Sequence, residues 1–318
     1  MIVERLNESE PIMVSVVCNT YNHGPYIAEA LDGFVMQETN FPFEVLVHDD
    51  ASTDNTADII REYEKKYPEI IKPYYETENQ YSKRDGSISR IQFGRAKGKY
   101  IALCEGDDYW TDPQKLQKQY EAMEKYPEID MCAHAATGIQ ASNGQINLII
   151  SPRDKACVIP TGDVILGGGG FVATNSLFYR MSMRNKIPEF VNYLRLDYSY
   201  QIWGSLRGGM LFLPDNMSVY RMNAPGSWTM RMKTKKKEYN AHSKKVCEML
   251  RILNEETFGR YQNEISERVS RIEFEILEQE QDYNRMKHGE LSYLYKQLPL
   301  ERKLKISVKQ FLHALGLY

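Results

Sequence analysis

Two pairs of adjacent aspartates end two short apolar segments of this 318-residue chain. Asp49–Asp50 follows residues 43–47, and Asp107–Asp108 follows closely on residues 99–104. Short apolar segments of this kind are typical of buried parallel strands. In open α/β sheets, ligands bind beyond the carboxyl ends of the strands. Carboxylates at such ends indicate a site that holds a divalent cation and hydrogen-bonds a polar ligand.

The composition is that of an ordinary soluble protein, with 42% hydrophobic and 26% charged residues. The length allows one large α/β domain and a smaller appendage. The net charge of −3 and the isoelectric point near 6.1 argue against a nucleic-acid partner.

The cysteines and the N-terminus bear on the compartment. Five scattered cysteines form no C-x-x-C pair, so we expect neither disulfides nor a zinc site and place the protein in a reducing compartment. The first ten residues lack the apolar core of a signal peptide. No run reaches the roughly 18 apolar residues of a transmembrane helix. We therefore expect a cytoplasmic protein.

Strands and helices alternate through the first half of the chain. Pro25 opens one predicted helix, at a position where its missing N–H costs nothing. This alternation predicts βαβ units and a mainly parallel sheet with helices on both faces. We expect residues 137–195 to be irregular, with Gly167–Gly170 marking a mobile loop or a close backbone approach. The predicted strands are 12–18, 43–47, 70–75 and 99–104, and further predicted helices precede Pro68 and span about 113–126.

The composition changes near residue 231, after which Lys, Glu and Leu dominate and apolar residues recur at helical spacing. This pattern predicts an α/β domain over residues 1–230 and a helical extension over 231–318. The three apolar stripes of the extension are Val246/Met249/Leu250/Leu253, Ile265/Val269/Ile272/Ile276 and Leu304/Val308/Phe311/Leu312/Leu315.

The turn after the first predicted strand reads Thr20-Tyr-Asn-His23. It contains no G-x-G-x-x-G, and the chain has neither a P-loop nor a G-x-S-x-G elbow. These absences disfavour dinucleotide-binding, P-loop and α/β-hydrolase sites. Thr20 and Asn22 are residues of a kind that can grip a nucleotide base and ribose through backbone groups and short side chains.

Three segments together carry a family resemblance: VSVVCNTYNH from residue 14, EVLVHDDASTD from residue 44 and RAKGKYIALCEGDD from residue 95. In order and spacing they resemble the inverting family 2 glycosyltransferases. Val219-Tyr-Arg221 with Asn223 resembles the end of the catalytic domain in bacterial polysaccharide-synthesising members. The resemblance covers about residues 11–230. It implies the Rossmann-like GT-A fold and transfer from a nucleotide-diphosphate sugar, with UDP favoured.

The second acidic segment resembles the D-x-D motif of that family, with Glu105 in place of the first aspartate. Asp107 and Asp108 are the predicted ligands of Mg²⁺ or Mn²⁺, which would stabilise a diphosphate leaving group. The alternative is a solvated acidic turn before the helix near Pro113.

The resemblance also assigns residues to the donor. Asp50 would accept a hydrogen bond from the nucleotide base, Thr20 and Asn22 would contact base or ribose, and Arg95 would face the diphosphate, with Arg90 as the alternative. Helix capping is the competing role for Asp50.

Asp197 is the predicted catalytic base, because it opens an amphipathic segment in which family members place their catalytic aspartate. A carboxylate with an ordinary pKa of about 3.9 is ionised at neutral pH and accepts the proton of the attacking hydroxyl. An N-cap role is the alternative for Asp197, and Glu189 and Asp215 are alternative bases.

The resemblance implies as acceptor a glycan or a lipid-linked saccharide in surface polysaccharide synthesis. Residues 299–318 form a basic amphipathic segment suited to an anionic bilayer, which would place the protein at the inner face of the cell membrane. Packing on the catalytic domain, or a homo-oligomer through the C-terminal helices, is the competing prediction. A noncatalytic scaffold or nucleotide-sugar-binding partner is the competing function, and the orientation of Asp197 discriminates it.

Overall fold

The computed structural model describes residues 10–83, 85–225, 227, 230 and 235–314. The chain divides into two compact units. The sheet unit comprises Met1–Ile187 and Leu196–Pro225, and the helical unit comprises Pro188–Arg195 and Gly226–Tyr318. The predicted domain boundary after residue 230 adjoins residues 231–234, which lie outside the described residues.

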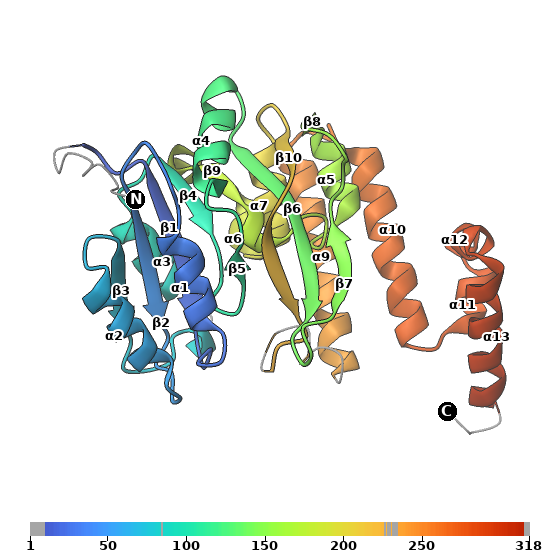
Figure 1. Cartoon of the computed structure of the whole chain (residues 1–318). Coiled ribbons are helices and arrows are strands. Elements are labelled where there is room, and N and C mark those ends of the chain that lie inside the picture. Colours follow the sequence, from blue (N-terminus) through green and yellow to red (C-terminus); the bar gives the residue numbers. More distant parts are fainter. Residues whose placement is uncertain (1–9, 84, 226, 228–229, 231–234, 315–318) are drawn as a thin grey trace. The chain divides into compact units, whose positions relative to one another are not determined.

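A ten-stranded sheet forms the centre of the sheet unit, in the order β3-β2-β1-β4-β9-β6-β10-β5, with β7 beside β6 and β8 beside β10 (Figure 1). Its first four strands are parallel, as predicted, and β1 lies between β2 and β4. Their apolar side chains alternate between two covered faces, which is the pattern of a buried parallel sheet. These strands are β1 (Val14–Thr20), β2 (Phe43–Asp49), β3 (Ile71–Tyr75) and β4 (Tyr100–Leu103).

The second half of the sheet is mixed. The long strands β6 (Met131–Gln140) and β10 (Met210–Met222) are parallel to each other, and four short strands pair antiparallel to their neighbours. Three of these lie in residues 137–195, so our expectation of an irregular segment there was wrong. Strands of three to five residues are too short to show a clear period. They are β5 (Tyr109–Trp110), β7 (Ile146–Ile150), β8 (Cys157–Ile159) and β9 (Phe178–Arg180).

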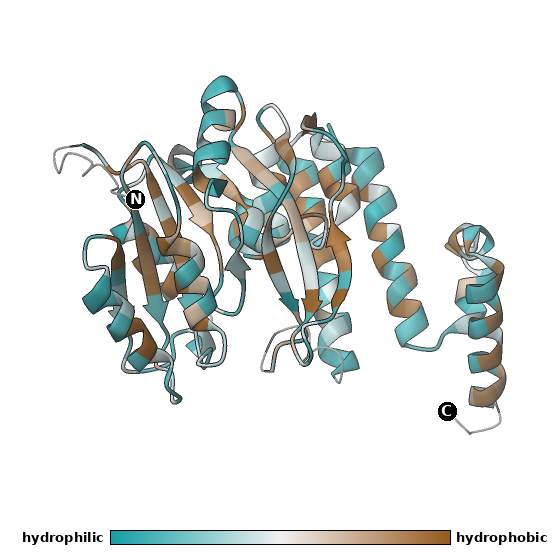
Figure 2. Ribbon diagram, in the orientation of Figure 1, coloured by the Kyte–Doolittle hydropathy of each residue, from teal (hydrophilic) through white to brown (hydrophobic). Residues whose placement is uncertain are grey.

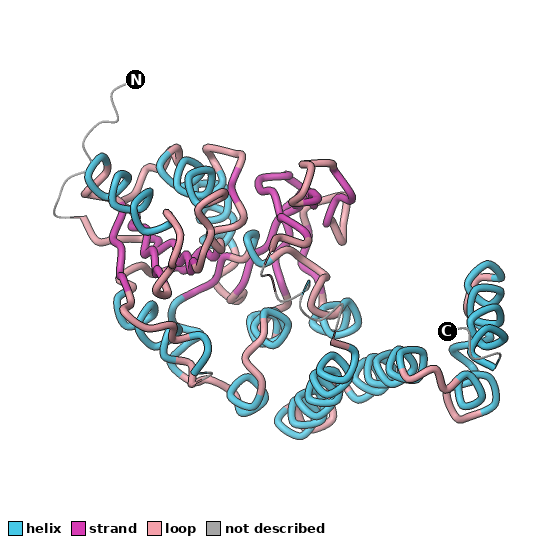
Figure 3. Tube along the Cα trace, turned by 90° about the horizontal axis from the view of Figure 1, so that it is seen from below, coloured by secondary structure: helices cyan, strands magenta, loops and turns pink. Residues whose placement is uncertain are grey.

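Helices cover both faces of the sheet (Figures 1 and 3). One face packs against α1 (Ile27–Val35), α2 (Thr56–Lys66) and α4 (Lys115–Lys125) in a single apolar core. The other face carries α3 (Ser87–Arg95) and α7 (Asp197–Ser205). Figure 2 shows apolar strands between helices whose outer turns are hydrophilic. This confirms an α/β fold with helices on both faces.

The predicted glycine run begins at the end of α5 (Thr161–Gly167). A Cβ on Gly167 would lie 2.1 Å from the ring of Phe171, and Gly168 has a φ of +74°. Close approach, not mobility, is therefore the reason for glycine at residue 167, and the left-handed backbone favours glycine at residue 168. Two 3₁₀ turns follow, η2 (Thr174–Ser176) and η3 (Met181–Asn185), whereas η1 (Tyr81–Lys83) precedes α3.

The helical unit confirms the predicted C-terminal helices. α9 and α10 bury most of the first two predicted stripes. In the third stripe, Leu304, Val308 and Phe311 of α13 are exposed, and Leu315 lies outside the described residues. The helices are α6 (Glu189–Tyr193), α9 (Lys236–Glu256), α10 (Gln262–Gln279), α11 (Tyr283–His288), α12 (Ser292–Gln297) and α13 (Leu300–Ala314). Within the described part of the chain, no helix has the length and apolar character needed to cross a membrane.

Candidate active site

The register of the parallel strands brings the two acidic segments to one edge. Thr20, the last residue of β1, pairs with Asp49 of β2, and Val17 pairs with Leu103 of β4. Beyond the strands, the Asp50 N–H donates to the Thr20 carbonyl at 2.9 Å, and the Gly106 N–H donates to the Asn19 carbonyl at 3.0 Å. Both acidic segments therefore flank the carboxyl end of β1.

Asn22 ties the turn after β1 to the loop after β2. Its φ of +54° lies in the left-handed region, which asparagine tolerates better than most residues. The Asn22 N–H donates to Ser52 Oγ at 2.9 Å, and Asn22 Oδ1 accepts from the Thr53 N–H at 2.7 Å. The Asn22 side-chain oxygen thus holds the loops together, and this shapes the floor of the predicted nucleotide site.

Thr20 and His23 point polar atoms at the second acidic segment. Thr20 Oγ1 and His23 Nδ1 are buried and have no hydrogen-bond partner among the described residues. A Cβ on Gly106 would lie 2.9 Å from Thr20 Oγ1 and 3.0 Å from His23 Nδ1, so only glycine fits there. Buried polar groups are rarely left unpaired, and these two unpaired atoms lie beside the second acidic segment.

His23 is a residue to which we assigned no role, although it belongs to the same turn as Thr20 and Asn22. Burial lowers the pKa of His23, and the nearby charge of Asp107 opposes this shift only in part. The imidazole is therefore neutral at pH 7 and offers one donor and one acceptor. Because His23 lies in the same turn as Thr20 and Asn22, the sequence could have indicated it as a site residue.

Asp50 is 2% exposed and already accepts three hydrogen bonds. They come from the Gln80 N–H at 2.6 Å, the Tyr81 N–H at 3.0 Å and Asn79 Nδ2 at 2.8 Å. A carboxylate offers about four acceptor positions. Asp50 therefore organises the segment that leads into η1, and it retains room for about one more donor. Its neighbour Asp49 accepts from Ser52 Oγ and serves the loop.

Asp107 and Asp108 differ sharply in their surroundings. Asp108 is 2% exposed, and its two oxygens accept from the Arg221 N–H at 2.7 Å and from Asn175 Nδ2 at 3.2 Å. Burial and the charge of Asp107 raise the pKa of Asp108 well above its usual range. The Asp107 carboxylate is half-buried and accepts no hydrogen bond from the described residues. Asp108 therefore braces the segment, and Asp107 is the carboxylate left for a ligand.

Arg221 braces the same segment from β10. Its Nη1 donates to the Asp107 carbonyl at 2.6 Å, and its Nη2 lies 2.8 Å from Glu29 Oε2. The guanidinium lies over the rings of Tyr26 and Tyr109, at 4.9 and 4.6 Å from their centroids. A cleft of about 600 Å³ opens beside it. The sequence singled out this segment only as the end of the domain, and no spacing rule linked Arg221 to Asp107.

Asp197, the first residue of α7, lies near Glu105. Burial raises the pKa of Glu105 to about 8, and the charges of Asp197 and then Asp107 are the next contributions. Asp197 is exposed and accepts from Thr174 Oγ1 at 2.5 Å, and desolvation by the surrounding protein raises its pKa. Glu105, Asp107 and Asp197 thus form a group that we call the acidic edge. The alternative base Asp215 instead pairs with Lys118 at 3.0 Å.

The acidic edge fits a divalent cation by its chemistry. Among the described residues, no set of three or more His, Cys, Asp or Glu side chains is arranged to hold a metal ion. Mg²⁺ commonly binds one or two carboxylates together with substrate phosphates, so a complete protein cage is not required. Asp107, with its carboxylate unengaged and other carboxylates nearby, supplies such a ligand.

Arg95, which we predicted to face the diphosphate, contacts β3 in this structure. Its Nη2 donates to the Lys72 and Pro73 carbonyls of β3 at 2.6 and 3.1 Å, and its guanidinium lies 5.5 Å from the Tyr74 ring. An edge strand that contains proline has unpaired carbonyls to satisfy, and Arg95 satisfies them. Arg90, the alternative, is exposed and pairs with Asp85 at 3.5 Å.

Comparisons with known proteins agree with this geometry. The family described as Glycosyl transferase family 2 matches residues 15–222. An uncharacterized protein of Mycobacterium tuberculosis is 38% identical over 221 residues, which cover 68% of this chain and 60% of the relative. TuaG of Bacillus subtilis, provisionally named a teichuronic acid biosynthesis glycosyltransferase, is 35% identical over 146 residues, 45% of this chain and 51% of TuaG. The chain thus spans about three fifths of the length of these mycobacterial relatives.

Solved structures share the fold. S. aureus TarS 1–349 in complex with UDP-GlcNAc has a TM-score of 0.57 at 17% identity, over 96% of this chain and 80% of that one. The mannosyltransferase PcManGT from Pyrobaculum calidifontis, in complex with GDP-Man and Mn²⁺, has a TM-score of 0.56 at 14% identity, over 99% and 85%. At these identities the likeness shows a common fold.

Glu105 makes the stability of the sheet unit depend on pH. Because its pKa is raised to about 8, the folded protein holds this proton more tightly than the unfolded chain does. Its contribution to stability is therefore present at low pH and is lost as the pH rises towards 8. Glu105→Gln should gain stability relative to the parent between about pH 5 and about pH 9, measured by urea unfolding. Glu62→Gln, on an exposed position of α2, is the matched control, and an equal gain in both variants would contradict the assignment.

Arg95→Ala should lower the free energy of unfolding by about 1–3 kcal/mol, because two carbonyls of β3 lose their donor. Nucleotide affinity should stay within a factor of about two, since the side chain is engaged by the carbonyls of β3. Urea unfolding and nucleotide titration measure the two effects, with Arg90→Ala as the exposed-arginine control. A loss of nucleotide affinity without a loss of stability would instead support the predicted contact of Arg95 with the diphosphate.

Proposed function

The chain belongs to glycosyl transferase family 2, and from that membership we propose that it is a metal-dependent inverting glycosyltransferase. It would move a sugar from a nucleotide-diphosphate sugar, with UDP favoured, to a hydroxyl of a glycan or lipid-linked saccharide. The observation that carries the proposal is the acidic edge, which lies beside the unpartnered polar atoms of the turn after β1.

Asp197 is the proposed base. It takes the proton of the acceptor hydroxyl while that oxygen attacks the anomeric carbon from the face opposite the leaving diphosphate, which inverts the configuration. The raised pKa of Asp197 supports this role, because a stronger base accepts the proton more readily. Glu105, with its pKa of about 8, is neutral at pH 7 and therefore adds no negative charge beside Asp107 and Asp197.

The donor occupies the end of β1 in this proposal. Asp50 accepts from the base through its remaining acceptor position, Asn22 and Thr20 bound the base and ribose, and the Thr20 hydroxyl with His23 meets the phosphates. The contacts of Asp50 and Asn22 hold the surrounding loops in place before the donor binds, which lowers the entropy lost on binding.

Asp107, with Asp108 behind it, would hold Mg²⁺ or Mn²⁺ on the diphosphate. The cation supplies neutralisation of the charge that develops on the leaving group. The Mn²⁺ of PcManGT and the UDP-GlcNAc of TarS support these choices for a shared fold. TuaG, through its name, supports a role in surface polysaccharide synthesis.

A cytoplasmic location, at the inner face of the membrane, stays a prediction. So do membrane contact through residues 299–318 and, as its alternative, a homo-oligomer. The noncatalytic scaffold is the second candidate function. It requires that no carboxylate occupy the base position, and the effect of Asp197 on Glu105 speaks against it.

Asp197→Asn should lower the transfer rate by about 10²–10⁴-fold, because the base is lost, while nucleotide affinity is retained. Turnover of a nucleotide sugar to free nucleoside diphosphate, in the presence of saccharide acceptors, measures the rate. Asp215→Asn is the matched control. Full activity in Asp197→Asn would remove the residue from the mechanism.

Donor identity is tested by thermal stabilisation with UDP-, dTDP- and GDP-sugars, each with Mg²⁺, Mn²⁺ or chelator. A ligand at about 100 times its dissociation constant adds roughly 2.7 kcal/mol. We expect a cation-dependent shift, largest for UDP-sugars, that Asp107→Asn abolishes. If no nucleotide sugar stabilises the folded parent with or without metal, the proposed function fails.

A further inference from the structure

The outer side of α13 carries an apolar stripe that no described residue covers. Leu300, Leu304, Val308 and Phe311 are 72%, 58%, 56% and 64% exposed. Their spacing of four, four and three residues places them on one side of the helix. Contiguous apolar surface of this kind on a soluble domain marks an interaction site.

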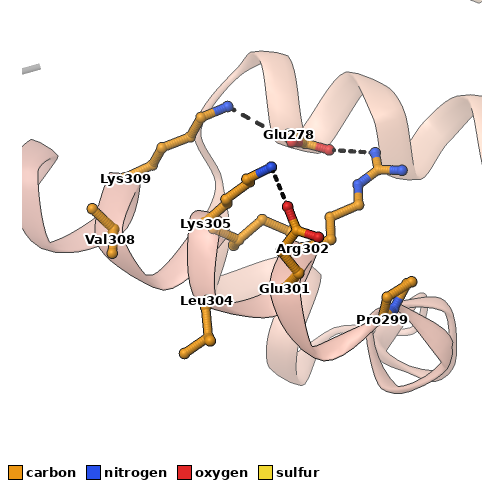
Figure 4. Close-up of a pocket in the computed structure, with 9 residues that line it drawn as sticks. Glu278, Pro299, Glu301, Arg302, Leu304, Lys305, Val308 and Lys309 are labelled. Atoms are coloured by element: carbon orange, nitrogen blue, oxygen red, sulfur yellow. Dashed lines mark hydrogen bonds and ion pairs between the residues drawn. The ribbon is translucent and has the colours of Figure 1, made fainter.

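The opposite side of α13 is already occupied. Ile306 is fully buried in an apolar cluster with Phe274, Leu277, Tyr283 and Met286 of α10 and α11. Arg302 Nη2 and Lys309 Nζ lie 2.9 and 3.9 Å from the Glu278 carboxylate. Figure 4 shows both cations turned towards Glu278, whereas Leu304 and Val308 point away from it. The helix is therefore held by its inner side, and the stripe needs a different partner.

The charge around the stripe is positive, although Arg302 and Lys309 pair with Glu278 and Lys305 pairs with Glu301. Residues 282–312 contain seven Lys and Arg against three Asp and Glu, a net charge of +4, whereas the whole chain carries −3. Lys303 and Lys305 flank the stripe, and Tyr293 of α12 is a further exposed aromatic residue of this region. The basic residues of residues 282–312 are Arg285, Lys287, Lys296, Arg302, Lys303, Lys305 and Lys309.

We propose that this side of α13 binds the surface of an anionic lipid bilayer, with the stripe inserted among the acyl chains and the lysines on the headgroups. An apolar helix face bordered by Lys and Arg is the pattern of an interfacial helix, and its binding combines apolar burial with attraction to anionic lipid. A second copy of the chain is disfavoured, because pairing two stripes would bring together two regions of net charge +4.

The proposal rests on the surface of the helical unit and deepens the proposed function by naming where a lipid-linked acceptor would be met. Because α13 is held by its own inner side, it needs no refolding to bind. Binding should therefore weaken with rising salt, since the attraction between the lysines and the headgroups is screened.

The test is co-sedimentation of the full chain with vesicles of phosphatidylcholine alone, or of phosphatidylcholine and phosphatidylglycerol in equal parts. The parent should bind the anionic vesicles and not the neutral ones. Leu304→Ser with Phe311→Ser should lower the partition coefficient by on the order of tenfold or more, because two inserted side chains are lost. Phe258→Ser is the matched control, because Phe258 is 97% exposed at the α9–α10 connection and should not matter.

A charge variant separates the two contributions. Lys303→Gln with Lys305→Gln should lower binding to anionic vesicles, whereas Lys65→Gln with Lys66→Gln on α2 should leave it unchanged. Circular dichroism melts establish that each variant is folded. Asp197→Asn should bind vesicles like the parent, so that a failure of transfer and a failure of docking are distinguished.

Three outcomes would overturn the proposal. One is absence of vesicle binding by the folded parent. Another is equal binding to neutral and anionic vesicles. The third is a concentration-dependent dimer in sedimentation that Leu304→Ser with Phe311→Ser converts to monomer, which would assign the stripe to a second copy.

Discussion

The site depends on the position of β1 between β2 and β4. Because all three strands are parallel and in register, every polar residue that follows them converges on one edge. More carboxylates than cations gather at this edge. The pKa of Glu105 and of Asp108 is raised by the burial of each group and then by the negative charge of neighbouring carboxylates. A bound divalent cation would offset this negative charge.

Hydrogen bonds from neighbouring segments hold the acidic residues in place. Asp108 and Arg221 link the second acidic segment to β10, and Asp50 links β2 to the segment before η1. The bond from Arg221 Nη1 to the Asp107 carbonyl is charge-assisted, which makes it stronger than one between neutral groups. Asp107 and Asp197 are left with few contacts of their own. Asp50, Asp108 and Arg221 therefore stabilise the edge of the sheet, whereas Asp107 and Asp197 are available to a ligand.

Much of this was predictable from sequence, and the limits have physical causes. The parallel strands and the acidic residues at their ends follow from local pattern, and the role of Asp197 stays a prediction from family resemblance. The sequence does not tell which aspartate of each pair stabilises the fold, because adjacent residues differ only in the direction of their side chains. The contacts of Arg95 with β3 and of Arg221 with Asp107 were not predicted, since a guanidinium reaches far enough for tertiary contacts to decide its partner. The short antiparallel strands were not predicted, because they contain too few residues to show an alternation of apolar and polar side chains.

In both units, groups that pack within the protein lie next to groups that have no partner in it. On α13 the pattern predicted an amphipathic helix, yet it did not reveal that Ile306 lies buried on one side while the apolar stripe faces outward on the other. When one side of a helix already packs in the apolar core, the other side remains available for binding. At the edge of the sheet, likewise, the aspartates that satisfy the protein leave their neighbours unsatisfied. In both places the unpartnered groups, more than the well-packed ones, indicate where the protein meets other molecules.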